Sequence, residues 1–263
     1  MRAKKSLGQN FLQDAWVIRQ IVDALDLSAG DVVVEIGPGQ GALTEVLVGT
    51  GANVVAIEFD RDLVPLLRSR FGDLPNFELV HDDALRFDLG SLASKGNMLK
   101  LVANLPYNIS TPILQRLMEQ KDAFSRLILM FQREVVKRIT AEPGNKERGF
   151  LTVLTENAFE VEFLFDVEPT AFRPVPAVWS SVVRLTPKVS DFEDLTGLRK
   201  ILSSAFAQKR KTILNNLKSV LEDAAGILTS SGIDTNRRAE TLTLREWKTI
   251  VTVIQAAKID KPK

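Results

Sequence analysis

Short runs rich in β-branched and apolar residues alternate with longer amphipathic stretches between about residue 32 and residue 186. This alternation is typical of βα units that build a mostly parallel sheet. The last two runs are separated only by residues 169–176, a proline-containing segment too short for a crossover helix, so these two strands should pair antiparallel. The expected strands are residues 32–36, 54–58, 77–80, 99–103, 127–131, 161–167 and 181–185.

Strand-like runs stop near residue 187, and the remaining residues show apolar positions at helical spacing. The sequence therefore predicts a larger α/β domain over residues 1–186 and a small helical domain over residues 187–263, joined by a linker at residues 187–191. The expected helices of the second domain are residues 195–206, 212–221 and 243–257.

The composition excludes several kinds of chemistry. The chain has no cysteine and a single histidine, His81, so disulfides, cysteine-based zinc sites and thiol catalysis are excluded, and no metal is expected. No stretch approaches the ~20 apolar residues of a membrane span, and the basic first ten residues lack the apolar run of a secretory signal. We therefore expect a soluble, cytoplasmic protein in which His81 is structural.

The net charge of +1 is unevenly distributed. Residues 187–263 hold 14 Lys and Arg against 9 Asp and Glu, a net charge of +5, whereas residues 1–186 hold 20 against 24, a net charge of −4. Clustered positive charge is what binding to nucleic-acid phosphates requires. The helical domain is therefore the part expected to contact a polyanion.

A glycine turn follows the first expected strand, in the order Gly37-Pro38-Gly39-Gln40-Gly41, and a helical stretch begins directly after it. Strand, glycine turn and helix in this order predict a nucleotide site, with Gly37 and Gly39 letting the backbone approach the ligand. Glu58 ends the next strand, where a carboxylate can accept hydrogen bonds from ribose hydroxyls. The spacing G-x-G-x-G favours a methyltransferase over a dinucleotide dehydrogenase, whose fingerprint is G-x-G-x-x-G, and a purely structural turn is the third reading.

An acidic pair, Asp82-Asp83, follows the third expected strand. The Asp83 carboxylate can accept from the amino group of an adenine while a neighbouring backbone amide donates to a ring nitrogen. Acidic residues at strand ends also serve as helix caps, so this assignment depends on the glycine turn.

The fourth expected strand ends in Asn104-Leu105-Pro106-Tyr107, and Thr-Pro at residues 111–112 predicts a helix N-cap and a first-turn proline. An adenine amino nitrogen is a poor nucleophile, because its lone pair is delocalised into the ring. The Asn104 side-chain oxygen and the Leu105 carbonyl can accept its hydrogens, and Pro106 stiffens the turn without adding a donor. Tyr107 offers a face on which a flipped base can stack. A loop with an ordinary Asn-Pro turn is the alternative.

These motifs give the chain a close resemblance to the KsgA/RsmA and Dim-type ribosomal RNA adenine dimethyltransferases, which are relatives of the Erm resistance methylases. The resemblance extends over nearly the whole chain. The residues that carry it are 5–12 (KSLGQNFL), 35–39 (EIGPG), Glu58, Asp83-Ala84, 104–107 (NLPY), 131–135 (FQREV), Phe172 with Pro174 and Pro176, 208–212 (QKRKT) and 238–240 (RAE).

The resemblance implies a Rossmann-like class I methyltransferase sheet that binds S-adenosylmethionine in a catalytic domain, followed by an RNA-binding helical domain. It implies that Asn10 and Leu12 close over the methionine end of the cofactor and that Phe172 stacks on the target adenine opposite Tyr107. Gly37, Gly39, Glu58, Asp83, Ala84 and Asn104 would complete the cofactor site. In this family two adjacent adenosines near the 3′ end of 16S rRNA, within the small subunit or its precursor, each receive two methyl groups.

One segment departs from the family pattern. Family members usually read Phe-x-Pro-x-Pro-x-Val-Asp-Ser, but here Trp179 occupies the Asp position and Ala177 a position that is often basic. Local contacts should therefore differ there.

A compact basic cluster, Lys209, Arg210 and Lys211, lies between two expected helices and is suited to phosphates. Lys4 and Lys5 are weaker candidates of the same kind. Such a triplet is often only solvated surface, and it is the family resemblance that favours RNA contact.

Two alternatives remain open. An Erm-like enzyme acting on 23S rRNA would use the same residues around the cofactor, although the Arg238-Ala239-Glu240 pattern favours the ribosome-assembly branch. A non-catalytic assembly factor could keep the fold, but it would not need both acceptors at Asn104 and Leu105. A monomer is expected in either case.

Overall fold

The computed structural model describes residues 4, 8–93, 98–106, 109–190, 192 and 195–259. Contacts divide the chain into two compact units, the first formed by residues 1–136 and 159–187 and the second by residues 137–158 and 188–263. The break after Pro187 lies one residue from the expected domain boundary, whereas residues 137–158 group with the helical part. The assignment of separate catalytic and RNA-binding domains stays a prediction.

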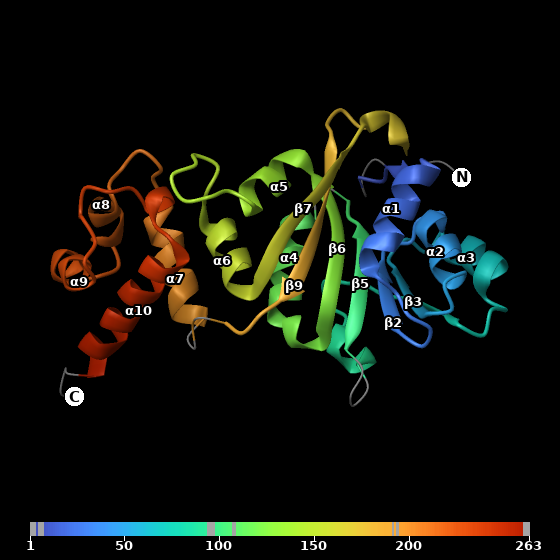
Figure 1. The fold of residues 1–263 in the computed structure, drawn as a ribbon, viewed down its shortest axis with the longest axis horizontal. Helices are drawn as coiled ribbons and strands as arrows, with labels where there is room; N and C mark the ends of the chain where they lie inside the picture. Colours follow the sequence, from blue (N-terminus) through green and yellow to red (C-terminus); the bar gives the residue numbers. More distant parts are fainter. Residues whose placement is uncertain are drawn as a thin grey trace. The chain divides into compact units, whose positions relative to one another are not determined.

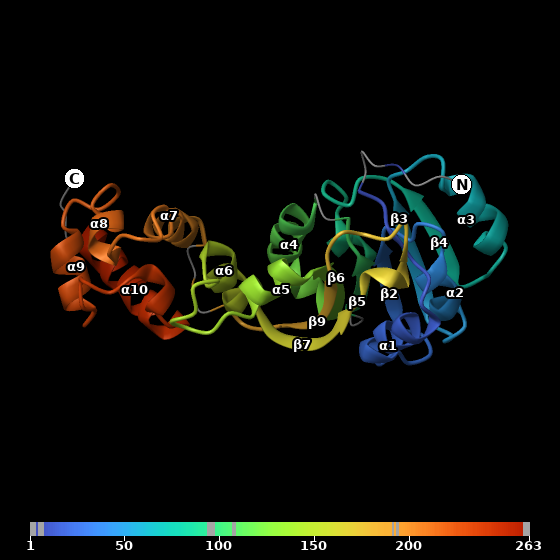
Figure 2. The same cartoon turned by 90° about the horizontal axis from the view of Figure 1, so that it is seen from above.

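Within the described residues of the first unit, seven strands form one sheet in the order β4-β3-β2-β5-β6-β9-β7 (Figure 1, with β4 labelled in Figure 2). Neighbours from β4 to β6 run parallel, and β9 runs antiparallel to both β6 and β7. All seven expected strands are present, and the predicted antiparallel pair is confirmed. Their bounds are β2 Val32–Ile36, β3 Asn53–Glu58, β4 Phe77–His81, β5 Leu99–Asn104, β6 Phe124–Gln132, β7 Phe159–Val167 and β9 Ser180–Pro187.

The helices of the first unit pack on both faces of this sheet, with α1 and α4 on opposite faces (Figure 2). Helix α1 shows why the sequence forms a helix there, since the Asp14 side chain accepts from the amides of Trp16 and Val17 at its start and the apolar face is buried. The helices are α1 Ala15–Leu25, α2 Ala42–Val48, α3 Val64–Phe71, α4 Ser110–Glu119 and, crossing into the second unit, α5 Arg133–Ile139; the 3₁₀ turns are η2 Leu89–Leu92, η3 Lys121–Ala123 and η4 Pro169–Ala171.

The start of α4 corrects the expectation at Thr111. The helix begins at Ser110 with Ile109 as N-cap, and no side chain caps it. Pro112 still lies in the first turn, where its missing N–H removes no helical hydrogen bond.

A two-stranded sheet that the hydrophobic pattern did not predict joins β1 Phe11–Leu12 to β8 Phe172–Arg173. Each strand has two residues, too few to show an alternating pattern. Phe11 pairs with Arg173 and Leu12 with Phe172. The pairing ties the N-terminal segment to the loop between β7 and β9.

The second unit is helical and is held partly by a buried arginine. The Arg148 guanidinium donates to the carbonyls of Ala141 at 2.9 Å and Leu242 at 3.2 Å, and it forms an ion pair with Glu156 at 2.6 Å. These bonds explain why residues 137–158 belong to this unit. Its elements are α6 Phe150–Ala158, α7 Leu195–Ala205, α8 Ile213–Leu217, α9 Ala224–Ser230, η5 Ala239–Thr241 and α10 Leu244–Ile259.

The helix expected over residues 212–221 is longer than the helix that the structure has there. Thr212 caps α8, but the helix ends at Leu217, and α9 is a separate helix that the sequence analysis did not include. In the part of the chain that the structure describes, no helix is long and apolar enough to cross a membrane.

Candidate active site

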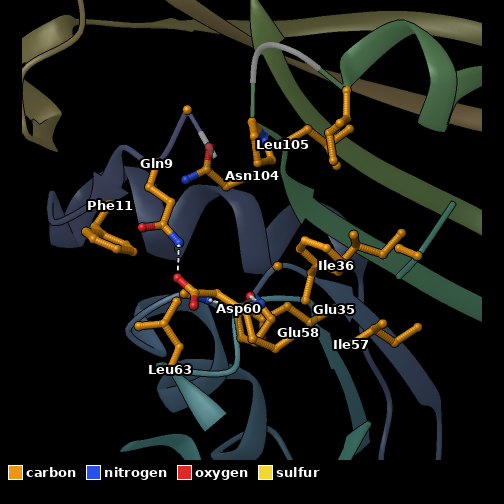
Figure 3. Close-up of a pocket in the computed structure, with 18 of the residues that line it drawn as sticks. Gln9, Phe11, Glu35, Ile36, Ile57, Glu58, Asp60, Leu63, Asn104 and Leu105 are labelled. Carbon is orange, nitrogen blue, oxygen red and sulfur yellow. Dashed lines mark hydrogen bonds between the residues drawn. The ribbon is translucent and has the colours of Figure 1, made fainter. Parts of the chain in front are cut away.

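A cavity of about 280 Å³ opens at the carboxyl ends of the parallel strands. The ends of β2, β3 and β5, the loop after β4 and the N-terminal segment supply its walls, which is where ligands bind in open α/β sheets. Figure 3 shows labelled side chains of the N-terminal segment, of β2 and β3, and of the end of β5 around it. The residues that line it are Gly8 to Leu12, Glu35 to Gln40, Ala42, Leu43, Ile57 to Asp60, Leu63, Asp82 to Leu85, Asn104 to Pro106, Ile109 and Phe172.

The glycine turn after β2 forms one wall, as predicted from its spacing. Gly37 and Gly39 have φ values of 69° and 59°, in the left-handed region that favours glycine. A Cβ atom at Gly39 would lie 3.1 Å from the ring of Phe11. The turn therefore leaves room both for the N-terminal segment and for a ligand that approaches its backbone.

Glu58 ends β3 and faces the same cavity (Figure 3). Its carboxylate accepts from the backbone amide of Gly39 at 3.1 Å and from that of Asp60 at 2.7 Å. Burial raises the pKa of Glu58, although these two amides oppose the shift. Each carboxylate oxygen has further lone pairs, so Glu58 can still accept hydrogen bonds from a ligand's hydroxyls.

Glu35, in β2, lines the cavity. From the sequence it was expected only to be part of the family motif, without a role of its own. Its side chain is buried, and Thr44 Oγ1 donates to Oε2 at 2.6 Å. Burial raises the pKa of Glu35 to about 7, the hydrogen bond from Thr44 opposes this shift, and the negative charge of Glu58 adds to it. A single acidic residue inside an apolar strand was the available signal.

Asp60 was also missed, because nothing in its sequence position distinguishes it from a surface carboxylate. It is 5% exposed, and it accepts from Lys4 Nζ at 2.6 Å and from Gln9 Nε2 at 2.8 Å. Burial opposes ionisation of Asp60, but the hydrogen bonds from Lys4 and Gln9 outweigh it and lower its pKa. Lys4 also forms an ion pair with Asp62 at 2.6 Å, so its ammonium group is paired with two carboxylates of the first unit.

The end of β5 brings Asn104, Leu105 and Pro106 into the cavity wall. Asn104 Nδ2 donates to the carbonyl of Asn10 at 3.3 Å, which links the loop of residues 104–107, the expected reaction loop, to the N-terminal segment. Leu105 is 2% exposed, and its amide donates to the carbonyl of Met130 at 3.4 Å. Tyr107, the expected stacking residue, lies outside the described residues.

The loop after β4 contributes Asp83 and Ala84 to the cavity. Asp83 Oδ1 accepts from the backbone amide of Leu85 at 2.9 Å, so the side chain also organises its own turn. No helix begins at Asp83, so the helix-cap alternative is wrong, and the side chain stabilises a turn while the residue lines the cavity. His81 ends β4, is exposed, and is not among the residues that line the cavity.

Leu12 pairs with Phe172 across β1 and β8, Asn10 directly precedes β1, and all three residues line the cavity. Phe172 is 1% exposed and also belongs to the hydrophobic core, beside Leu12 and residues of α1. Packing thus holds the side chain in place, and the residue lines the cavity.

The basic cluster lies in the second unit, in the turn between α7 and α8. Lys209, Arg210 and Lys211 are all exposed, and Lys209 Nζ donates to the carbonyl of Lys146 at 3.5 Å. Lys5 lies outside the described residues.

Comparison with known proteins agrees with this geometry. The model of the family described as ribosomal RNA adenine dimethylase matches residues 1–256. The ribosomal RNA small subunit methyltransferase A of Pseudomonas putida is 44% identical over 246 residues, which are 92% of this chain and 91% of that protein. The protein of the same name from Laribacter hongkongensis is 47% identical over 248 residues, 93% of each chain.

Solved structures show the same fold. A dimethyladenosine transferase from Plasmodium falciparum superposes with a TM-score of 0.81 at 23% identity, covering 94% of this chain and 98% of that one. The 23S rRNA methyltransferase ErmE superposes with a TM-score of 0.73 at 25% identity, covering 94% and 100%. The expected Rossmann-like methyltransferase sheet is confirmed. Since the family model matches nearly the whole sequence and relatives share more than two fifths of their residues with it, the chain belongs to the ribosomal RNA adenine dimethylase family.

Proposed function

We propose that this protein transfers methyl groups from S-adenosylmethionine to the N6 amino groups of two adjacent adenosines near the 3′ end of 16S rRNA, during assembly of the small ribosomal subunit. The observation that carries the proposal is that Asn104, at the end of β5, lines the same cavity as the Gly37–Gly39 turn and Glu58. One cavity thus joins a nucleotide-type site to acceptors suited to an amino group.

The cavity residues fit S-adenosylmethionine. Glu58 presents carboxylate oxygens at the position where a ribose hydroxyl binds in this sheet type, and Asp83 presents a partly exposed carboxylate beside Ala84 for the adenine end. Asn10 and Leu12 would enclose the methionine end. When bound, the cofactor supplies an electrophilic methyl group on its sulfonium.

The residues of the reaction loop position the nucleophile. The Asn104 side-chain oxygen and the Leu105 carbonyl accept the two amino hydrogens, which favours a pyramidal nitrogen and frees its lone pair for attack. Pro106 stiffens the turn and contributes no competing donor. The aromatic faces of Phe172 and Tyr107 hold the extruded base. No strong base is needed, because the methylated amine is acidic enough to lose its proton to water.

The substrate assignment follows the relatives. Proteins 42–47% identical to this chain are named for methylation of small-subunit rRNA, whereas ErmE, at 25% identity, is named for 23S rRNA. Lys209, Arg210 and Lys211 would contribute to RNA binding from the second unit. We also propose that the protein acts as a cytoplasmic monomer without a metal.

The test uses purified protein, labelled S-adenosylmethionine, and small and large subunits from a strain that lacks the corresponding enzyme. We expect label only in the small subunit, and mapping should find dimethyladenosine at two adjacent positions. Label in 23S rRNA would establish the Erm-like alternative. Tight binding to small subunits without any transfer would establish the assembly factor.

A further inference from the structure

Trp179 is an exposed indole of the first unit and directly precedes β9. Its side chain is 40% exposed. The guanidinium carbon of Arg133 lies 5.7 Å from the ring centroid, and the Arg133 amide donates to the Trp179 carbonyl at 3.0 Å. This contact is a cation–π pair that holds one side of the indole in place.

Further contacts fix the arginine. Arg133 forms an ion pair with Asp166 at 3.2 Å, and Ser181 Oγ donates to the other oxygen of the same carboxylate at 2.5 Å. Asp166 and Ser181 lie on β7 and β9, which are neighbouring strands. Trp179 is therefore backed by a cation whose own position is set by the sheet.

The strand register places Trp179 at the same edge as the reaction loop. Asn104 pairs with Met130 of β6, and Gln132, two residues further along β6, pairs with Ser180, which directly follows Trp179. Strand β9 is the second strand from β5, and Trp179 lies three residues beyond the level of Asn104, so the two residues are about 10 Å apart across the strands and about 10 Å apart along them. This separation is too large for contact with the target base and suits a neighbouring nucleotide.

The loop that ends at Trp179 begins at the cavity. It follows Phe172, which lines the cavity, and it exposes Val175 and Val178 at 53% and 42% while Pro176 is buried. Val178 and Trp179 are adjacent exposed apolar residues, and exposed apolar side chains grouped beside a site mark a candidate binding surface. An indole backed by a guanidinium is suited to stacking on a nucleobase. Every base has a π-face, so this contact does not depend on the RNA sequence.

We propose that Trp179 stacks on the base of a nucleotide that flanks the target adenosine, with Arg133 holding the indole in the stacking position. The proposal rests on the RNA substrate inferred above and adds a contact that the family's usual aspartate cannot make. Trp179 is then a substrate-binding residue that sets the path of the RNA strand across the sheet edge. It takes no part in methyl transfer itself.

The test compares Trp179→Ala, Trp179→Phe and Trp179→Asp in the full-length protein. We expect Trp179→Ala and Trp179→Asp to raise KM for small subunits about 5- to 150-fold, the range that follows from loss of one base stack. The value of kcat at saturating substrate and the affinity for S-adenosylmethionine should stay unchanged, and Trp179→Phe should restore most of the loss. Trp16→Ala is the matched control, since Trp16 is an exposed indole, 62% accessible, that lines no part of the cavity.

A second measurement reports the contact directly. In a Trp16→Phe background the remaining indoles are Trp179 and Trp247, and Trp247 is fully buried. Addition of a short RNA that carries the target adenosines should quench the fluorescence of Trp179, and a duplex of the same length should quench it less.

An unchanged KM in Trp179→Ala would overturn the proposal, provided that the wild-type protein methylates small subunits under the same conditions. Equal losses of kcat and of cofactor affinity, without rescue by phenylalanine, would also overturn it by showing a structural role. A wild-type protein that transfers no methyl group contradicts the proposed function instead, so the two failures are distinguishable. Normal RNA kinetics together with loss of a protein contact would identify the patch as a protein-docking surface and likewise reject the stacking role.

Discussion

Gln9 Nε2 donates to Asp60 Oδ2 at 2.8 Å and thereby joins the N-terminal segment to the loop after β3 (Figure 3). The backbone amide of Lys4 donates to Gln9 Oε1 at 2.9 Å, and the Lys4 ammonium binds the same aspartate. Residues on both sides of this contact line the cavity. The bond therefore holds one cavity wall against another.

We expect Gln9→Glu to weaken binding of S-adenosylmethionine by roughly tenfold, since a hydrogen bond to a charged group contributes ~1.5 kcal/mol. The substitution keeps the shape of the side chain but places a carboxylate against Asp60. Isothermal titration calorimetry measures the change. Asp62→Asn is the control, because it removes a partner of Lys4 and keeps the Gln9–Asp60 bond, so it should bind the cofactor normally. Equal affinities in Gln9→Glu and the wild type would show that this contact does not shape the cofactor site.

Asn104→Ala should reduce kcat for methyl transfer by about 100-fold or more, the loss typical of removing one group that stabilises a transition state. The affinity for small subunits should change little, because the substitution keeps the basic cluster of residues 209–211 and the proposed stacking residues. Single-turnover transfer and filter binding separate the two effects. Transfer at the wild-type rate would remove Asn104 from the mechanism.

Arg210→Ala should weaken binding to small-subunit rRNA and lower the slope of log K against log salt by ~1, if the guanidinium neutralises one phosphate. Binding isotherms at several salt concentrations measure the slope. Lys200→Ala offers a matched control, since Lys200 is exposed on α7 outside the basic cluster. An unaltered slope in Arg210→Ala would identify the cluster as ordinary surface.

Glu35 should make stability fall as pH rises from about 4.5 to about 7. Its folded pKa is raised to about 7 from the ordinary value of 4.5, so in this window the folded state holds a proton that the unfolded state releases. Each unit of difference corresponds to 1.36 kcal/mol, which gives a loss of about 3 kcal/mol in the free energy of unfolding by pH 7 and above.

Glu35→Gln should remove most of this fall, because glutamine keeps an acceptor for Thr44 and carries no charge. Part of the slope should persist, since the pKa of Glu58 is raised as well. Urea unfolding at intervals between pH 5 and pH 8 measures the difference. Glu45→Gln, on the exposed side of α2, should keep the wild-type slope. Identical slopes in Glu35→Gln and the wild type would show that Glu35 is ionised throughout.

The pattern of apolar and polar residues along the chain was sufficient to predict the seven strands of the main sheet and the positions of the loops that form the site. Alternating apolar runs marked the strands, and the glycine turn, Glu58 and Asn104 each end a parallel strand. Carboxyl ends of neighbouring parallel strands share one edge, so their convergence follows from topology alone. The cavity around these residues confirms that convergence.

Contacts between distant segments were not predictable in the same way. Nothing near Asp60 indicates that it is buried under Gln9, and the two-residue strands β1 and β8 are too short to carry a pattern. Residues 137–158 join the helical unit through Arg148, whose partners include the carbonyl of Leu242, far along the chain. A side chain of this kind resembles any surface arginine until its neighbours are known.

The sequence by itself determined the strands of the seven-stranded sheet, the order of the site loops and the family, because these depend on periodicity and on motifs that are local in the chain. Only the tertiary structure decided which polar side chains are buried together, as at Glu35 with Thr44 and at Asp60 with Gln9. It also decided that Trp179 lies exposed against Arg133. The physical reason is that burial and charge pairing depend on segments brought together by folding, and their free energies are set by neighbours that a local pattern does not contain.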